Sequence, residues 1–122
     1  WTLALYKSGD LKKAYTKFLQ TLLMNPFVIA RVIGVDYIMP FEPGSNIPTK
    51  EWADWIADEI YNLWDEDAAA WAKESFCDEK SQKILFRYYE IEKQLVTEPV
   101  GEKRSELVKE MFAMMDNPQK FI

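Results

Sequence analysis

Acidic side chains between positions 54 and 67 come closest to forming a chemical site in this sequence. Hard divalent cations take oxygen ligands, so a cation site can be drawn from them. The Asp-x-Asp-x-Asp-Gly spacing of a calcium loop is absent. The simpler interpretation is a solvated helix face with acids placed favourably near a helix N-terminus, so we expect no metal site. The residues concerned are Asp54, Asp58, Glu59, Asp65, Glu66 and Asp67.

Side chains suited to catalysis are few. The chain has no histidine, which removes the commonest general base and the commonest transition-metal ligand. Acidic neighbours at Asp78 and Glu79 disfavour the thiolate that a reactive Cys77 would need. Glu51 and Glu59 could act as a carboxylate pair, but no spacing singles out such a pair. We therefore expect a protein that is not an enzyme on its own and holds no cofactor.

Four tryptophans are the other side chains with a potential role in recognition. Trp52, Trp55, Trp64 and Trp71 could form an aromatic anchor, because tryptophan is enriched at protein interfaces. At helical spacing the simpler interpretation is that they belong to the core, with Trp55 and Trp71 the most exposed of the four. A cluster of methionines near the C-terminus is likewise expected to fill the core, except Met114, which lies off the apolar stripe.

Composition limits the classes of protein and partner. A chain of 122 residues with 48% apolar residues suits one domain with one core. The net charge of −5 and the scattered basic residues argue against nucleic acid and against an anionic membrane surface. No apolar run reaches the ~18 residues that a membrane span needs. The single cysteine favours a reducing, cytoplasmic location. The chain begins at Trp1 and not at Met, so we expect a piece of a longer protein.

The chemistry-bearing residues must be positioned by helices. Gly9 and Asp10 end one short helix and cap the next, and Asn25 and Pro26 begin a third. Apolar residues at i, i+3, i+4 and i+7 indicate helices over most of the chain. The expected helices cover residues 1–8, 11–24, 27–33, 50–64, 66–75, 80–95 and 102–115. The fold class is therefore all-α, with five to seven helices in an irregular bundle or short solenoid.

Two of these helices carry specific burial expectations. The helix at 50–64 should bury Trp52, Trp55, Ile56, Ile60 and Leu63 and expose a polar face that includes Asp54 and Asp58. The helix at 102–115 should bury Leu107, Val108, Met111, Phe112 and Met115. Residues 34–48 contain three prolines and two glycines, which predicts a long loop.

Residues 4–26 resemble a tetratricopeptide repeat that starts part-way through its first helix, since Ala4, Gly9, Ala14, Phe18 and Pro26 fall at its spacing. Residues 25–72 resemble the segment that follows the repeats in the suppressor-of-tumorigenicity family. The matching residues are Asn25, Pro26, Phe27, Val28, Gly34, Pro40, Pro43, Gly44, Ser45, Ala53, Leu63 and Trp64. Together these resemblances cover residues 4–72. They imply a repeat-based role in protein–protein contact, with no catalytic residues attached to the pattern.

The sequence thus predicts one helical domain over residues 1–122. It divides into a repeat-like hairpin with a capping helix at 1–33, a loop at 34–48 and a helical remainder at 49–122. We expect a non-catalytic protein–protein interaction module, the terminal part of a repeat array, with another protein as partner. An auxiliary helical domain of a larger enzyme and an oligomerising structural domain are the alternatives, and a homo-oligomer stays open.

Six residues are the candidates for contact with a partner protein. The first helix of such a hairpin would line a groove, which points to Tyr6 and to Lys7 at the helix end. The 34–48 loop contains three large apolar side chains that are costly to leave in water without a use. The alternative is that these three form a satellite core beneath the loop. The candidates are Tyr6, Lys7, Tyr37, Met39, Phe41 and Trp55.

Overall fold

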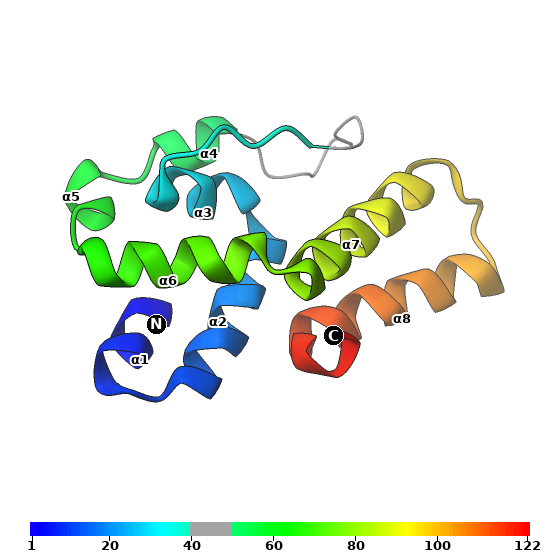
Figure 1. The fold of residues 1–122 in the computed structure, drawn as a ribbon. Helices are drawn as coiled ribbons and strands as arrows, with labels where there is room; N and C mark the ends of the chain where they lie inside the picture. The colour runs from blue at the N-terminus through cyan, green and yellow to red at the C-terminus, as the bar shows by residue number, and fades with distance from the viewer. Residues whose placement is uncertain (40–49) are drawn as a thin grey trace.

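A computed structural model describes residues 1–39 and 50–122 of the chain (Figure 1). Helices make up most of these residues and no strand occurs among them, so the all-α fold class is confirmed. None of the helices in these ranges is long and apolar enough to cross a membrane. The elements are α1 Thr2–Ser8, α2 Leu11–Met24, α3 Pro26–Ile33, α4 Lys50–Asp54, α5 Asp58–Tyr61, α6 Glu66–Cys77, α7 Glu79–Thr97, α8 Glu102–Asp116 and the 3₁₀ turn η1 Pro118–Phe121.

Local capping explains why the first three helices begin and end where the sequence predicts. Gly9 ends α1 in the left-handed conformation, with φ of 88°, which favours glycine. The Asp10 carboxylate then accepts a hydrogen bond of 3.2 Å from the backbone N–H of Lys13. Asn25 accepts one of 3.0 Å from the N–H of Phe27, and Pro26 occupies the first position of α3.

The core gathers around α2, which lies at the centre of the bundle. Ala14, Phe18, Leu19, Leu22 and Leu23 on its apolar stripe are fully buried. Helix α2 contacts α1, α3, α7 and α8, and its Phe18 ring meets Trp71 of α6. Burying each such side chain contributes about 1.5–3 kcal/mol. The Tyr89 hydroxyl of α7 donates a hydrogen bond of 2.8 Å to the carbonyl of Leu23. The largest core side chains are Phe18, Leu19, Leu22, Leu23, Ile29, Ile84, Leu85, Tyr89, Ile91, Leu107 and Met114.

Both ends of the chain meet at α2. Helix α6 crosses between α3 and α1, and α7 and α8 form a second hairpin (Figure 1). The turn η1 then returns to α2, where the Gln119 side-chain amide donates a hydrogen bond of 3.0 Å to the carbonyl of Lys12. The arrangement is therefore an irregular bundle.

The predicted helix over 50–64 is wrong in both its continuity and its burial. It is divided into α4 and α5 because Ala57 has φ of −59° and ψ of 140°, which is not helical. Trp52 and Trp55 precede this break, and α4 contacts α3 with Ala53 as its one buried residue. Four side chains predicted to be buried are instead more than half exposed, namely Trp52 at 61%, Trp55 at 75%, Ile60 at 54% and Leu63 at 62%.

The predicted buried face of the last helix is also wrong in part. Met114 is 1% exposed, whereas Phe112 is 66% exposed. The buried stripe of α8 runs through Leu107 and Met114, with Met111 packed against it. The end of α8 is covered by α2 and η1, and the Gln20 amide donates a hydrogen bond of 3.0 Å to the carbonyl of Met115 there. This contact turns Met114 inward and Phe112 outward.

Candidate interaction surface on α4 and α5

One arginine attaches residues 50–64, which we call the α4–α5 segment, to the rest of the protein. Arg31 on α3 donates a hydrogen bond of 2.7 Å to the carboxylate of Asp54 on α4 and one of 2.5 Å to that of Asp58 on α5. Its guanidinium carbon also lies 4.8 Å from the centre of the Tyr61 ring. A single planar cation therefore contacts both short helices, a geometry that the guanidinium fork provides and an ammonium does not.

Ala53 and Tyr61 complete the attachment. Ala53 is 1% exposed and is the one buried residue of α4, which packs on α3. The Tyr61 hydroxyl donates a hydrogen bond of 2.5 Å to the Ala53 carbonyl, which joins α5 to α4. Burial raises the pKa of Tyr61, while the charge of Arg31 lowers it in part. The hydroxyl therefore stays protonated and available as a donor at neutral pH.

The outward side of α4 carries a pair of tryptophans. The Trp52 and Trp55 rings contact each other, with centroids 5.3 Å apart and planes tilted by 35°. We call these two side chains the tryptophan pair. Ile60 and Leu63 follow in the same segment and are also more than half exposed. Exposed apolar side chains concentrated in this way are typical of interaction sites, whereas single exposed ones need no explanation.

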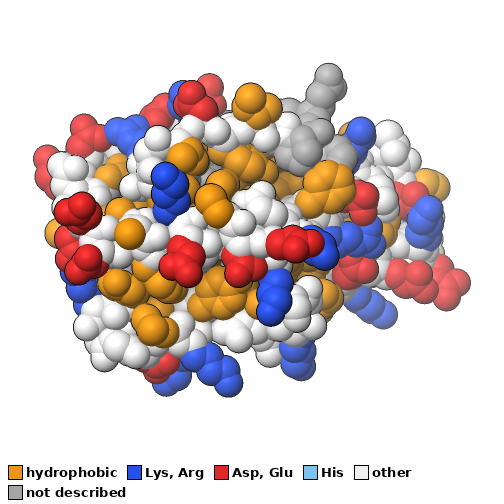
Figure 2. Space-filling view, viewed as in Figure 1, with side chains coloured by type: hydrophobic (Ala, Val, Ile, Leu, Met, Phe, Trp, Pro, Cys, Tyr) orange, Lys and Arg blue, Asp and Glu red, His pale blue; other side chains and the backbone are white. Residues whose placement is uncertain are grey.

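The stretch of chain that contains the tryptophan pair is rich in acidic residues. Figure 2 shows acidic side chains gathered at the end of the molecule where α5 and the start of α6 lie. Asp65 caps α6 by accepting a hydrogen bond of 2.9 Å from the N–H of Ala68, and it also pairs with Lys7. Glu66 and Asp67 stand in the first turn of α6, where acids interact favourably with the helix dipole.

Three of the six acids that could have formed a cation site have other partners. Asp54 and Asp58 pair with Arg31, and Asp65 serves as a helix cap. Within residues 1–39 and 50–122, no group of three or more Cys, Asp or Glu side chains is arranged to hold a metal ion.

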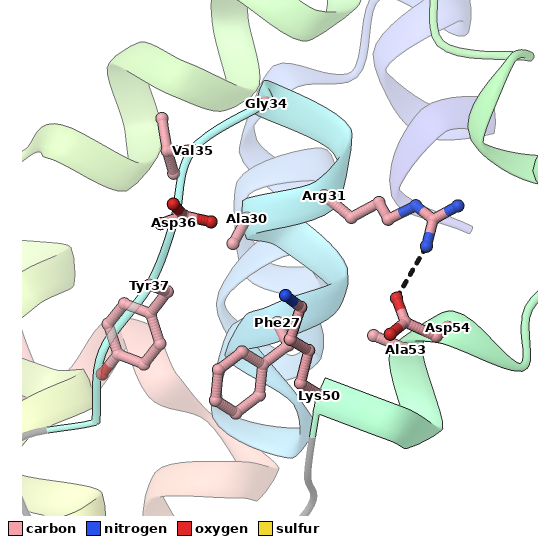
Figure 3. A pocket seen from close by; sticks show the side chains of 10 residues that line it. All are labelled: Phe27, Ala30, Arg31, Gly34, Val35, Asp36, Tyr37, Lys50, Ala53 and Asp54. Carbon is pink, nitrogen blue, oxygen red and sulfur yellow. Dashed lines mark hydrogen bonds and ion pairs between the residues drawn. The ribbon is translucent and has the colours of Figure 1, made fainter.

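A hollow of about 470 Å³ lies between α3, the chain after it and α4. Phe27, Tyr37 and Lys50 line it, together with Asp36 and Asp54 among others. In Figure 3 the Arg31–Asp54 pair lies on one side of α3, and Asp36 and Tyr37 lie on the other. The described residues that line the hollow are suited to ion pairing and aromatic contact.

Helix α6 covers the part of α1 that was expected to face a partner. The Tyr6 ring stacks on Trp71 of α6 with centroids 5.0 Å apart. Lys7 pairs with Asp65 at the start of the same helix. Both candidates are therefore engaged within the chain, and we leave them out of the candidate surface.

The described part of the 34–48 loop packs as the satellite-core alternative expects. Tyr37 is half-buried, and its ring contacts Phe27 and Phe76 edge-on at centroid distances of 5.6 and 6.0 Å. Burial raises the pKa of Tyr37. Met39 is partly buried against the core. Phe41 lies outside the described residues. Of the five candidates that the structure describes, Trp55 is the one that is an exposed large apolar side chain.

The sequence analysis did not identify Arg31 as a contact residue, and it predicted that Trp52 is part of the core, whereas Trp52 is exposed. A signal was present, because Arg31 is the one charged residue in an otherwise apolar helix, and Asp54 and Asp58 stand four positions apart. That spacing places two carboxylates on one helix face. Trp64 and Trp71 do pack against the core, so the four tryptophans divide into two buried in part and two exposed.

Comparisons of the chain with protein-family models, curated proteins and solved structures found no significant match.

Proposed function

We propose that this chain is a non-catalytic protein–protein interaction module that binds its partner through the outward side of the α4–α5 segment. The observation that carries the proposal is the tryptophan pair, two indoles in contact that stay exposed on a segment held to the bundle by Arg31. Tryptophan and arginine are the residues most enriched among those that dominate binding energy. Because Arg31 already fixes the segment, little conformational entropy is lost when a partner docks.

The α1–α2 hairpin supports the related proposal that the chain is the terminal unit of a helical repeat array. Ala14 is fully buried, and a small residue at such a position lets two helices approach closely. The exposed, unpaired thiol of Cys77 suits a reducing compartment, so we place the module in the cytoplasm.

Affinity capture from an extract of the cells that express the protein tests the proposal. The wild-type chain is compared with Trp52→Ala/Trp55→Ala and with a control, Val100→Ala/Phe112→Ala. The control also removes two exposed apolar side chains, but from the region of α8. We expect proteins retained by the wild type and the control to be lost from the tryptophan variant, while circular dichroism of all three stays the same. Equal retention by all three would refute the proposed surface.

A further inference from the structure

The net negative charge of the chain comes from the stretch of sequence that contains the tryptophan pair. Residues 50–67 contain one basic residue, Lys50, and seven acidic residues. The whole chain has 20 acidic and 15 basic residues, so the remaining residues carry 13 acids and 14 bases. The net negative charge of the protein is therefore concentrated in residues 50–67. The acids are Glu51, Asp54, Asp58, Glu59, Asp65, Glu66 and Asp67.

Intramolecular pairing neutralises only part of this charge. Arg31 contacts Asp54 and Asp58, and Lys7 contacts Asp65. Adding these two cations to residues 50–67 reduces the local net charge from −6 to −4. Glu59, Glu66 and Asp67 are exposed at the surface. Screening at physiological salt acts over about 8 Å, so these charges act on a partner that contacts the segment.

We infer that the segment of the partner protein that docks on the tryptophan pair is basic and amphipathic, with Lys or Arg side chains over the indole rings and apolar side chains beside them. This inference rests on the proposed function and specifies the partner that it leaves open. Complementary charge gives such a contact its specificity and speeds association. Cations are attracted to the face of an indole, and the chain itself places the Arg31 guanidinium over the Tyr61 ring.

The same charges disfavour other occupants. A second copy of this chain in a two-fold symmetric contact would bring the same acids face to face. Nucleic acids and anionic membranes would be repelled. An acidic protein segment would be repelled in the same way, whereas a neutral apolar segment would gain nothing from the charge.

Peptide binding to the intact chain tests the inference. The probe is a labelled helical peptide of about 18 residues with Leu on one face and Lys on the other, and binding is followed by fluorescence anisotropy. A second peptide has Glu in place of every Lys. We expect the Lys peptide to bind and to weaken at least about tenfold when the salt is raised from about 0.05 to about 0.5 M. The Glu peptide should not bind measurably.

Charge variants locate the binding site. Glu59→Gln/Glu66→Gln/Asp67→Asn neutralises three exposed acids within residues 50–67, and Glu74→Gln/Glu102→Gln/Glu106→Gln neutralises three exposed acids outside that range. Both variants change the net charge equally. We expect the first to weaken binding of the Lys peptide about tenfold and the second less than about twofold. Equal weakening would show that only the overall charge matters, and would overturn the inference.

The remaining outcomes separate this inference from the proposed function. If both peptides bind equally and Trp52→Ala/Trp55→Ala weakens both, the surface docks partners without regard to charge, and only the inference fails. If the Lys peptide binds but the tryptophan variant binds it as well as the wild type does, the proposed surface itself is wrong. Absence of binding by either peptide would overturn the inference, while the capture experiment would still decide the proposed function.

Discussion

Helix α2 and the α4–α5 segment are both amphipathic in sequence, yet they contact the bundle differently. Helix α2 packs through its apolar side chains, whereas the α4–α5 segment contacts α3 through Ala53 and two carboxylates. Helix α2 turns its apolar stripe inward, and Phe18 and Leu22 are fully buried. In the α4–α5 segment the carboxylates of Asp54 and Asp58 contact Arg31 and stay partly open to solvent, while Trp52 and Trp55 are exposed. The orientation of a short amphipathic helix thus depends on the side chains of its neighbour. Helix α3 provides the Arg31 guanidinium, and α4, which packs on α3, has Ala53 as its one buried residue.

The largest expected effect is at the centre of the bundle. Leu22→Ala on α2 should lower the free energy of unfolding by about 2–5 kcal/mol, because it removes buried methyl groups and leaves a cavity. Leu63→Ala in the α4–α5 segment should change it by less than about 0.5 kcal/mol. Urea denaturation measures both. A similar loss in the two variants would mean that Leu63 is part of the core.

The α1–α2 crossing should be the next most sensitive position. Ala14→Leu should cost about 1–3 kcal/mol because the added side chain has no room between the helices. Lys13→Leu, on the exposed side of α2, should change stability little and serves as the matched control. Thermal unfolding of both variants checks the hairpin register. Equal shifts in the melting temperatures of the two variants would show that the register is incorrect.

Loss of Arg31 should have a smaller effect, confined to one region. Arg31→Met removes hydrogen bonds to Asp54 and Asp58 that are partly open to solvent, so we expect a loss of about 1 kcal/mol. Hydrogen exchange should accelerate in α4 and α5 and stay unchanged in α2 and α7. Arg31→Lys keeps the charge without the fork geometry and should restore protection only in part. Unchanged exchange in α4 and α5 would show that Arg31 does not hold the segment.

The smallest expected effect is at the tryptophan pair. Trp52→Ala/Trp55→Ala removes two large side chains, yet it should change the free energy of unfolding by less than about 0.5 kcal/mol because both are exposed. Trp71→Ala is the contrast, since Trp71 packs against Phe18 and Tyr6 and should cost several times more. Urea denaturation of the two variants measures the change in the free energy of unfolding of each. A loss of more than about 2 kcal/mol in the double variant would place the pair in the core.

The parts of the fold that local interactions decide could be predicted from the sequence. Gly9, Asp10, Asn25 and Pro26 set the ends of α1, α2 and α3 through contacts a few residues away. The orientation of the α4–α5 segment could not be predicted in this way, because it depends on Arg31, which is distant in sequence. The apolar pattern of residues 50–64 also assumes one continuous helix, which the break at Ala57 removes.

The buried face of α8 likewise depends on contacts distant in sequence. Two overlapping apolar stripes exist on α8, one ending at Phe112 and Met115 and one at Met114. The choice between them depends on η1 returning to α2, where Gln119 reaches Lys12. No periodicity within α8 encodes that contact.

Hydroxyl-radical footprinting of the wild-type chain, read by mass spectrometry at each tryptophan, tests the central claim most directly. That claim is that Trp52 and Trp55 are exposed to solvent while the carboxylates of Asp54 and Asp58 contact Arg31. We expect Trp55 and Trp52 to be oxidised several times faster than Trp64 and Trp71, because the first two are more exposed to solvent. Protection of Trp52 and Trp55 equal to that of Trp71 would mean that the segment faces the other way, and would contradict the account.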